Sequence, residues 1–213
     1  MSAPPTLQTS PHFTAFVQGT RITSGLLADV VTHAKDQLGS HSAADTVLIF
    51  RDATGEQVDV DLHGPLKKIL QHLPVFASPE AAPGTDSDEA APLRPGRPKL
   101  GVVPREVTLL PRHWDWLNDQ PGGASVTLRK LVEDARRASL PADQARRARE
   151  ACYRFMQATA GNLPRFEDAS RALFAGQRSS FQQATRLWPA DLRAYALALA
   201  APAFITIPKT EQS

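Results

Sequence analysis

Residue types that commonly perform chemistry are few in this chain and lie far apart. The six histidines run from His12 to His113, and no two of them have the spacing that places a zinc-binding pair on a helix. Cys152 is the single cysteine, so a disulfide within the chain and an all-cysteine metal site are excluded. A cysteine nucleophile needs a base and an electropositive pocket, whereas the stretch AREACYRFMQA is typical of a buried helix. We therefore expect Cys152 to fill space in a core.

Asp59 and Asp61 stand two residues apart in the stretch QVDVDLH. On a strand this spacing puts both carboxylates on one face, where their oxygens could hold a hard cation. The solvent-facing side of a half-buried strand explains the two residues more simply. The glycines form no phosphate loop, dinucleotide-binding motif or nucleophile elbow. We therefore expect no metal, no cofactor and no catalytic residue, and hence a protein that is not an enzyme.

Positive charge is concentrated in the middle of the chain. Residues 1–90 contain five Lys and Arg against eleven Asp and Glu, for a net charge of −6. Residues 91–150 contain twelve against seven, for +5, and residues 151–213 contain seven against four, for +3. Such segregation favours a polyanion or an acidic surface as the partner of the middle segment, although basic helices are also common as solvated faces.

The elements that must position these residues begin with an acidic α+β domain over residues 12–73, after a disordered tail over residues 1–11. Two short strands surround Gly19, a helix with an apolar stripe ends at Gly39, and a hairpin joins TVLIFRD to QVDVDLH. A short helix is expected to follow at Leu66. The order strand, strand, helix, strand, strand predicts a small antiparallel sheet with one face covered by the helix.

The rest of the chain begins with a linker over residues 74–98, which is rich in proline, alanine and acidic residues. A strand-helix-helix segment is expected over residues 99–138, a helical bundle over 139–201 and a loose tail over 202–213. Pro141 is expected to start a new helix. The fold class is therefore α+β: a ββαββ-like antiparallel sheet domain, a proline-rich linker and a mostly helical half.

The strand-helix-helix segment resembles the ribbon-helix-helix fold, in which two chains pair their strands into an antiparallel ribbon that lies in the major groove of DNA. Its expected strand, residues 102–110, has no partner in the helical half, so pairing with a second copy predicts a homodimer. The alternative is that this strand joins the N-terminal sheet of the same chain. The second helix, capped by Ser125, would present free backbone N–H groups to a phosphate. Just upstream, residues 94–99 read RPGRPK and resemble the core of an AT-hook, whose arginine enters the minor groove.

The expected strand can adopt two registers. With Leu110 facing the core, Arg105, Val107 and Leu109 face the bases, and only the arginine suits that position. The opposite register buries Val107 and Leu109 but turns Glu106 towards phosphate. That contact is repulsive unless the carboxylate accepts a hydrogen bond from a cytosine amine.

Two functions from different classes follow from these features. The first is a homodimeric DNA-binding protein, a candidate transcriptional regulator, and the second is a protein-interaction or dimerisation module without nucleic-acid binding or catalysis. Trp114 and Trp116 are two apart on a helix, so their side chains diverge by about 200° and one of them is expected in an interface. The residues expected near nucleic acid are Arg94, Arg97, Lys99, Arg105, Thr108, Ser125, Arg129 and Lys130. The residues expected in an interface are Val107, Leu109, Trp114 and Trp116.

The acidic domain is expected to regulate and not to read DNA, because its net charge would be repelled by a phosphate backbone. It should lie away from the duplex or compete with the duplex for the basic middle segment through the linker. A chain that begins near Pro92 should then bind DNA at least as tightly as the whole protein. The gain should be larger at low salt, where charge repulsion is least screened.

Four stretches of this chain form long and specific motifs: GRPKLGVVPREVTLLPRHWDWL, PGGASVTLRKLVEDAR, FEDASRALFAG and WPADLRAYALALA. They resemble an uncharacterised bacterial family, domain of unknown function 2239, over about Phe13 to Leu199. The resemblance implies a bacterial cytoplasmic protein and supplies no mechanism and no catalytic residue. The first residues lack the pattern of an export signal, and the most apolar stretch, Ala194 to Ile207, is short and interrupted by Pro202. A cytoplasmic protein without a membrane partner is therefore expected.

Overall fold

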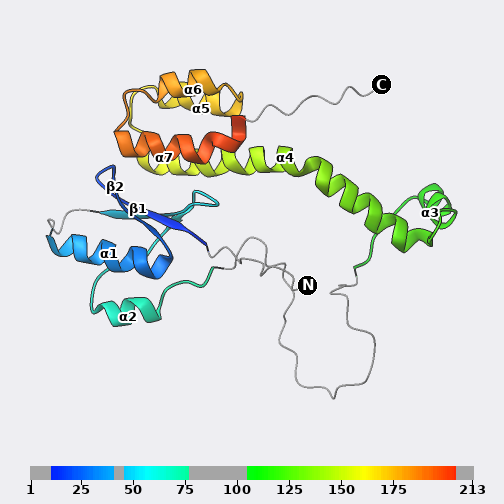
Figure 1. Ribbon diagram of the computed structural model, residues 1–213, viewed down its shortest axis with the longest axis horizontal. Coiled ribbons are helices and arrows are strands. Elements are labelled where there is room, and N and C mark those ends of the chain that lie inside the picture. Colours follow the sequence, from blue (N-terminus) through cyan, green and yellow to red (C-terminus); the bar gives the residue numbers. More distant parts are fainter. Residues whose placement is uncertain (1–10, 41–45, 77–104, 205–213) are drawn as a thin grey trace, which may run out of the picture. The chain divides into compact units, whose positions relative to one another are not determined.

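The computed structural model describes residues 11–40, 46–76 and 105–204 (Figure 1). Contacts between residues divide the chain into two units, of which the first joins residues 1–76 to 139–213 and the second contains residues 77–138. The longest described helix, α4 (Gly123–Ala160), begins in the second unit and ends in the first.

Within the described residues, an antiparallel sheet of four strands in the order β2-β1-β3-β4 forms the centre of the first unit. Gln18 and Gly19 connect the first two strands, and both have positive φ, at 49° and 81°. A two-residue turn with both residues in the left-handed region matches the twist of a hairpin, which explains the glycine at this position. The strands are β1 (Phe13–Val17), β2 (Thr20–Gly25), β3 (Val47–Arg51) and β4 (Gln57–Val58).

Helices α1 (Leu27–Ser40) and α2 (Leu66–Gln71) cover one face of the sheet (Figure 1). Phe13 and Ile49 from the sheet pack there with Val30 of α1 in one buried cluster. The expected antiparallel sheet covered by a helix is therefore present, and the α+β class is confirmed.

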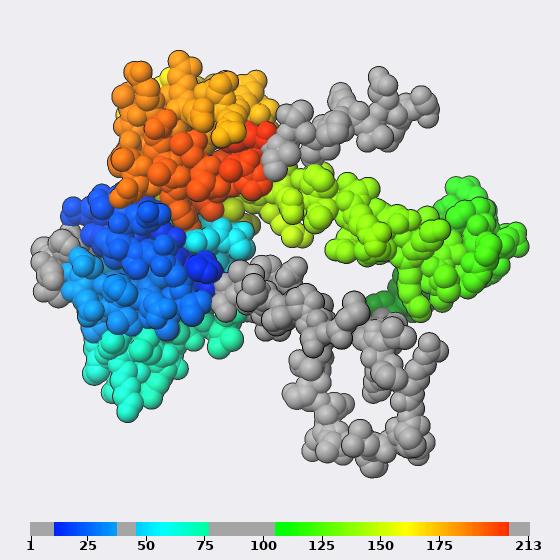
Figure 2. All heavy atoms as spheres, viewed as in Figure 1, coloured from blue at the N-terminus to red at the C-terminus, as the bar shows by residue number. Residues whose placement is uncertain are grey.

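The opposite face of the sheet is covered by the C-terminal helices. Phe16 and Phe50 point to this side, and their ring centroids lie 5.4 Å and 5.0 Å from that of Phe155 in α4. The ring of Tyr195, in α7 (Ala190–Ala200), lies 4.7 Å from Phe155 and 5.3 Å from Phe16. Figure 2 shows the result on the surface, where the N-terminal residues in blue directly adjoin the C-terminal helices in orange and red.

The sheet and the helical bundle therefore share one core, which differs from the expected division into a domain over residues 12–73 and a separate bundle over 139–201. The physical reason lies in β1, because all five of its residues are buried and such a strand must be covered on both faces. A chain that begins near Pro92 would lose the sheet and uncover Phe155, whose ring packs on Phe16 and Phe50. This truncation would therefore disturb the core of the helical half, so DNA affinity compared with the whole protein would not isolate the effect of the acidic charge.

The remaining helices pack against the second half of α4, whose buried residues recur at spacings of three and four from Ala145 onwards. Trp188 is buried ahead of α7, and its indole N–H donates a hydrogen bond to the Pro164 carbonyl at 2.9 Å. Cys152 is also fully buried, as expected, and burial raises the pKa of its thiol to about 12. These helices are α5 (Phe166–Phe174), α6 (Arg178–Ala184), α7 and the short 3₁₀ helix η1 (Ala201–Phe204).

Pro141 lies inside α4, so the expected start of a new helix at this residue is wrong. A proline within a helix leaves the carbonyl four residues earlier, here that of Arg137, without its backbone partner. Residues 136–142 are all exposed, so water can hydrogen-bond this carbonyl and the helix continues.

Residues 105–110, the described part of the expected ribbon strand, form no strand and do not join the sheet. The rest of that strand, residues 102–104, lies outside the described residues. Leu110 is extended, with φ −66° and ψ 149°, because a residue before proline is kept out of the helical region. A strand forms only when it can hydrogen-bond to a neighbouring strand. In the expected ribbon that neighbour belongs to a second chain, so the ribbon stays a prediction.

Candidate functional site

The predicted site residues that the structure describes lie in the second unit, in residues 105–138, here named the α3–α4 hairpin. Its first helix is α3 (Pro111–Asn118), and the chain then reverses into α4. Gly122 and Gly123 form the reversal with φ of 91° and 72°. Residues with a Cβ rarely adopt this region. The two consecutive glycines therefore allow the chain to reverse just before α4.

The α3–α4 hairpin leaves most of its apolar surface uncovered. Leu117, at 3% exposed, is the one buried side chain among its described residues. The exposed apolar side chains are Val107, Leu110, Trp116, Val126, Leu131 and Val132, each between 46% and 63% exposed. A helical hairpin of this size does not bury enough apolar surface to offset the entropy lost when it is ordered.

The four residues predicted for an interface lie on this hairpin. Val107 and Trp116 are exposed, whereas Leu109 and Trp114 are half-buried. Leu131 and Val132 also belong to the exposed apolar surface, although they were not among the predicted interface residues. The sequence carries a signal for them, an apolar stripe at helical spacing, but a stripe alone does not show whether it packs within the chain or against a partner.

The residues predicted to contact DNA divide into two groups. Arg94, Arg97 and Lys99 lie outside the described residues. Arg105, Thr108, Ser125, Arg129 and Lys130 are all exposed. Residues 105–138 hold six Lys and Arg against five Asp and Glu, so the hairpin itself has a net charge of only +1 and much of the positive charge of the middle segment lies outside it.

The arginines of α4 differ in how far their charge is neutralised. Arg136 and Arg137 approach the carboxylate of Glu133 at 2.9 Å and 3.1 Å, and the hydrogen bond from Arg136 is the largest cause of the lowered pKa of Glu133. By contrast, Arg129 and Lys130 form no ion pair with any described residue. Their charge remains available to an anionic partner.

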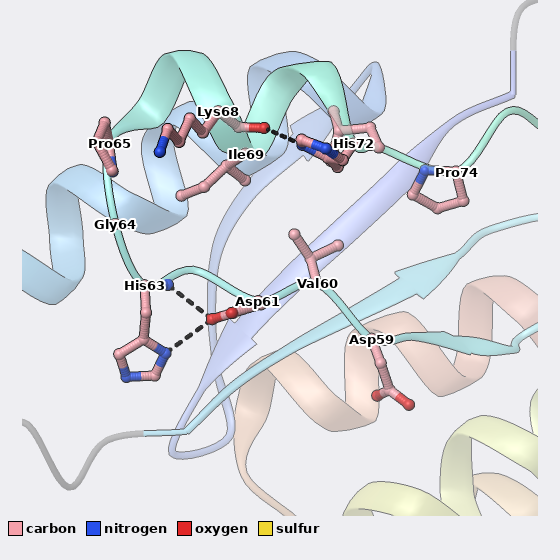
Figure 3. A pocket seen from close by; sticks show the side chains of 11 residues that line it. Asp59, Val60, Asp61, His63, Gly64, Pro65, Lys68, Ile69, His72 and Pro74 are labelled. Carbon is pink, nitrogen blue, oxygen red and sulfur yellow. Dashed lines mark hydrogen bonds and ion pairs between the residues drawn. The ribbon is translucent and has the colours of Figure 1, made fainter.

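A pocket of about 460 Å³ lies in the first unit between α2 and the segment that follows β4 (Figure 3). One oxygen of Asp61 accepts hydrogen bonds from the backbone N–H of His63 at 2.9 Å and faces the His63 Nδ1 at 2.8 Å. These contacts lower the pKa of the Asp61 carboxyl. The His63 and Asp61 side chains are 98% and 80% exposed, so water competes for each of these bonds.

The structure separates Asp59 from Asp61. β4 ends at Val58, so the two carboxylates do not lie on a strand and do not share a face. Asp59 accepts a hydrogen bond from the Gln57 side chain at 3.0 Å, and Figure 3 shows its carboxylate pointing away from that of Asp61. In the described part of the chain, no group of three His, Cys, Asp or Glu residues could hold a metal ion.

Comparison with known proteins gives a family and no activity. Residues 12–200 match the model of a family described as an uncharacterized protein conserved in bacteria (DUF2239). No curated protein and no solved structure matches the chain. Among the described helices, none combines the length and the apolar composition needed to cross a membrane.

Proposed function

The chain belongs to this family of uncharacterised bacterial proteins, and we propose that it acts as a homodimer joined through the α3–α4 hairpin. The observation that carries the proposal is the set of apolar side chains that the hairpin leaves uncovered. Fully burying one large apolar side chain contributes about 1.5 to 3 kcal/mol, so even partial coverage of six of them is a substantial driving force.

A second copy of the chain is the partner that these residues favour. The near balance of positive and negative charge in the hairpin means that two copies do not repel each other strongly. In a two-fold dimer the same patch faces itself, so each exposed residue is covered without a second type of surface. The extended segment before Pro111 would gain in the partner's equivalent segment the neighbour that it lacks within one chain.

The mass of the full-length protein in solution tests this proposal directly. Light scattering coupled to gel filtration should give twice the 23.1 kDa mass of one chain at micromolar concentration. A mass of one chain across the whole accessible concentration range would overturn the proposal, because the hairpin would then be stable with its apolar side chains in water.

DNA binding by this dimer is the second candidate function. It is favoured by the exposed side chains of Arg129 and Lys130, which no described carboxylate neutralises, unlike Arg136 and Arg137 on the following turns. Ser125 lies about one turn before Arg129 on α4 and is exposed as well, so its hydroxyl could donate a hydrogen bond to a phosphate. A dimer would present two copies of these groups to one duplex.

Fluorescence anisotropy on random and A·T-rich duplexes tests the second candidate. If the protein contacts phosphates, its affinity should fall with salt with a log–log slope of about −0.9 per phosphate, because bound counterions are released. The double variant Arg129→Gln with Lys130→Gln removes two charges from each subunit, so it should reduce that slope by about 3.6 if both subunits contact the duplex. The matched control is Arg171→Gln with Arg178→Gln, which removes the same charge from exposed positions of the first unit. An absence of binding at low salt would exclude DNA as the partner and leave the dimerisation module.

A further inference from the structure

A second pocket in the first unit lies beside Asp52, where the end of β3 meets α4 and α7. Its volume is about 480 Å³, and it is open to solvent, so a small molecule bound there would be only partly buried. Its walls are mostly small or apolar side chains, namely Ala53, Ala148, Ala151, Ala198, Leu199 and Pro202. The polar side chains that line it are Asp52, Gln144 and Arg147. These residues come from three distant parts of the sequence, so no motif marks the pocket.

The carboxylate of Asp52 is held firmly on one side. The hydroxyls of Tyr195 and Thr14 donate hydrogen bonds to its Oδ1 atom at 2.7 Å and 2.9 Å. Both donors are almost completely buried, and burial raises the pKa of Tyr195, so its hydroxyl keeps the proton that it donates. The backbone N–H of Asp52 also donates to the His12 carbonyl at 3.0 Å. The position of this carboxylate is thus fixed by groups of the sheet and of α7.

The charge of Asp52 has no counterion among the described residues. Arg147 lines the same pocket but forms no ion pair with Asp52. A half-buried carboxylate without a nearby cation retains the cost of its partial removal from water. The pocket therefore has one negative and one positive group in its lining, and they form no ion pair with each other.

We propose that this pocket binds a free amino acid with an apolar side chain. The ammonium group would meet Asp52, the carboxylate would meet the guanidinium of Arg147, and the side chain would lie on the alanines and Leu199. Arg147 also acts electrostatically on Asp143, one turn earlier on α4, but no carboxylate forms an ion pair with it among the described residues. A simple amine would engage only Asp52 and a simple acid only Arg147, so a zwitterion matches the two charges better than either. This inference is independent of dimerisation and of DNA binding, because every residue involved belongs to the first unit.

Calorimetric titration of the full chain with free L-leucine, L-methionine and L-phenylalanine tests the proposal. At least one of them should give saturable heat and raise the melting temperature. The N-acetyl and the carboxamide derivatives of that amino acid, which each lack one charge, should bind at least about tenfold more weakly. The proposal is overturned if none of the three amino acids binds, or if both derivatives bind as tightly as the parent.

Substitution of Arg147 separates this pocket from any other binding surface. Arg147→Gln changes an exposed side chain, so the fold should persist, and the affinity should fall by about tenfold or more. Arg146→Gln is the matched control, since Arg146 is the neighbouring arginine on α4 but does not line the pocket. Asp52→Asn keeps an acceptor for Tyr195 and Thr14 and removes the charge, and it should weaken binding similarly. Equal affinity in Arg147→Gln and in the Arg146→Gln control would also overturn the proposal.

Discussion

Gly55→Ala is expected to lose about 2 to 5 kcal/mol of folding free energy, a large part of the total for most domains. Gly55 is buried in the turn between β3 and β4, with φ at +64°, where a residue with a Cβ is strained. A Cβ built at this position would also overlap the backbone carbonyl of Ala151 in α4. Neither backbone can move away easily, because the turn closes a hairpin of the sheet and Ala151 lies in a packed helix. Urea unfolding followed by circular dichroism measures the loss.

Gly64→Ala is the matched control for this variant. Gly64 has a positive φ of 89°, but a Cβ at that position would meet no atom within 4 Å. The control should therefore lose only the backbone contribution, about 1 to 2 kcal/mol. Equal losses in the two variants would contradict the inference that the β3–β4 turn packs directly against α4.

The same turn shows what the sequence alone predicted about the fold. The sequence predicted a turn at Gly19 and a hairpin between TVLIFRD and QVDVDLH, and the structure has both. Turn residues act locally and therefore leave a local signal. The contact of Gly55 with Ala151 was not predicted. It joins residues almost a hundred positions apart, and no periodicity within either segment records it.

The partner of the second sheet face was missed for the same reason. The alternation in β1 and β3 shows that Phe16 and Phe50 are apolar, but it does not show which element covers them. In the structure the covering element is α4, through Phe155, which merges two segments that a proline-rich stretch separates in the sequence. A linker in the sequence is therefore not a boundary between cores in this chain.

The candidate sites also differ in whether their residues are close together in the sequence, and only those with a local pattern were predicted. The apolar surface of the α3–α4 hairpin was partly identified from sequence, because Trp116 and the strand-like segment before Pro111 leave local patterns. The pocket at Asp52 was not identified, since Asp52, Arg147 and Leu199 become neighbours only when α4 and α7 pack on the sheet. Asp59 and Asp61 show the opposite error, in which a local spacing suggested a shared face that β4 is too short to provide.

Val132→Asp is expected to convert the proposed dimer into a monomer. Val132 is 63% exposed in the single chain, so the substitution costs little there, but in the dimer it would place a carboxylate from each copy in an apolar interface. Loss of about 3 kcal/mol or more would raise the dissociation constant by at least about a hundredfold. Sedimentation equilibrium over a range of concentrations measures this change.

Leu187→Asp provides the matched control, because Leu187 is 67% exposed and lies in the first unit, outside the α3–α4 hairpin. It introduces the same charge at a similarly exposed apolar position and should leave the dissociation constant unchanged. Both variants should keep the near-ultraviolet circular dichroism of the core, to which the buried Trp188 and Tyr195 contribute. A dimer that survives Val132→Asp but is broken by Leu187→Asp would place the interface on the C-terminal helices, and the hairpin would then need another partner to cover its apolar side chains.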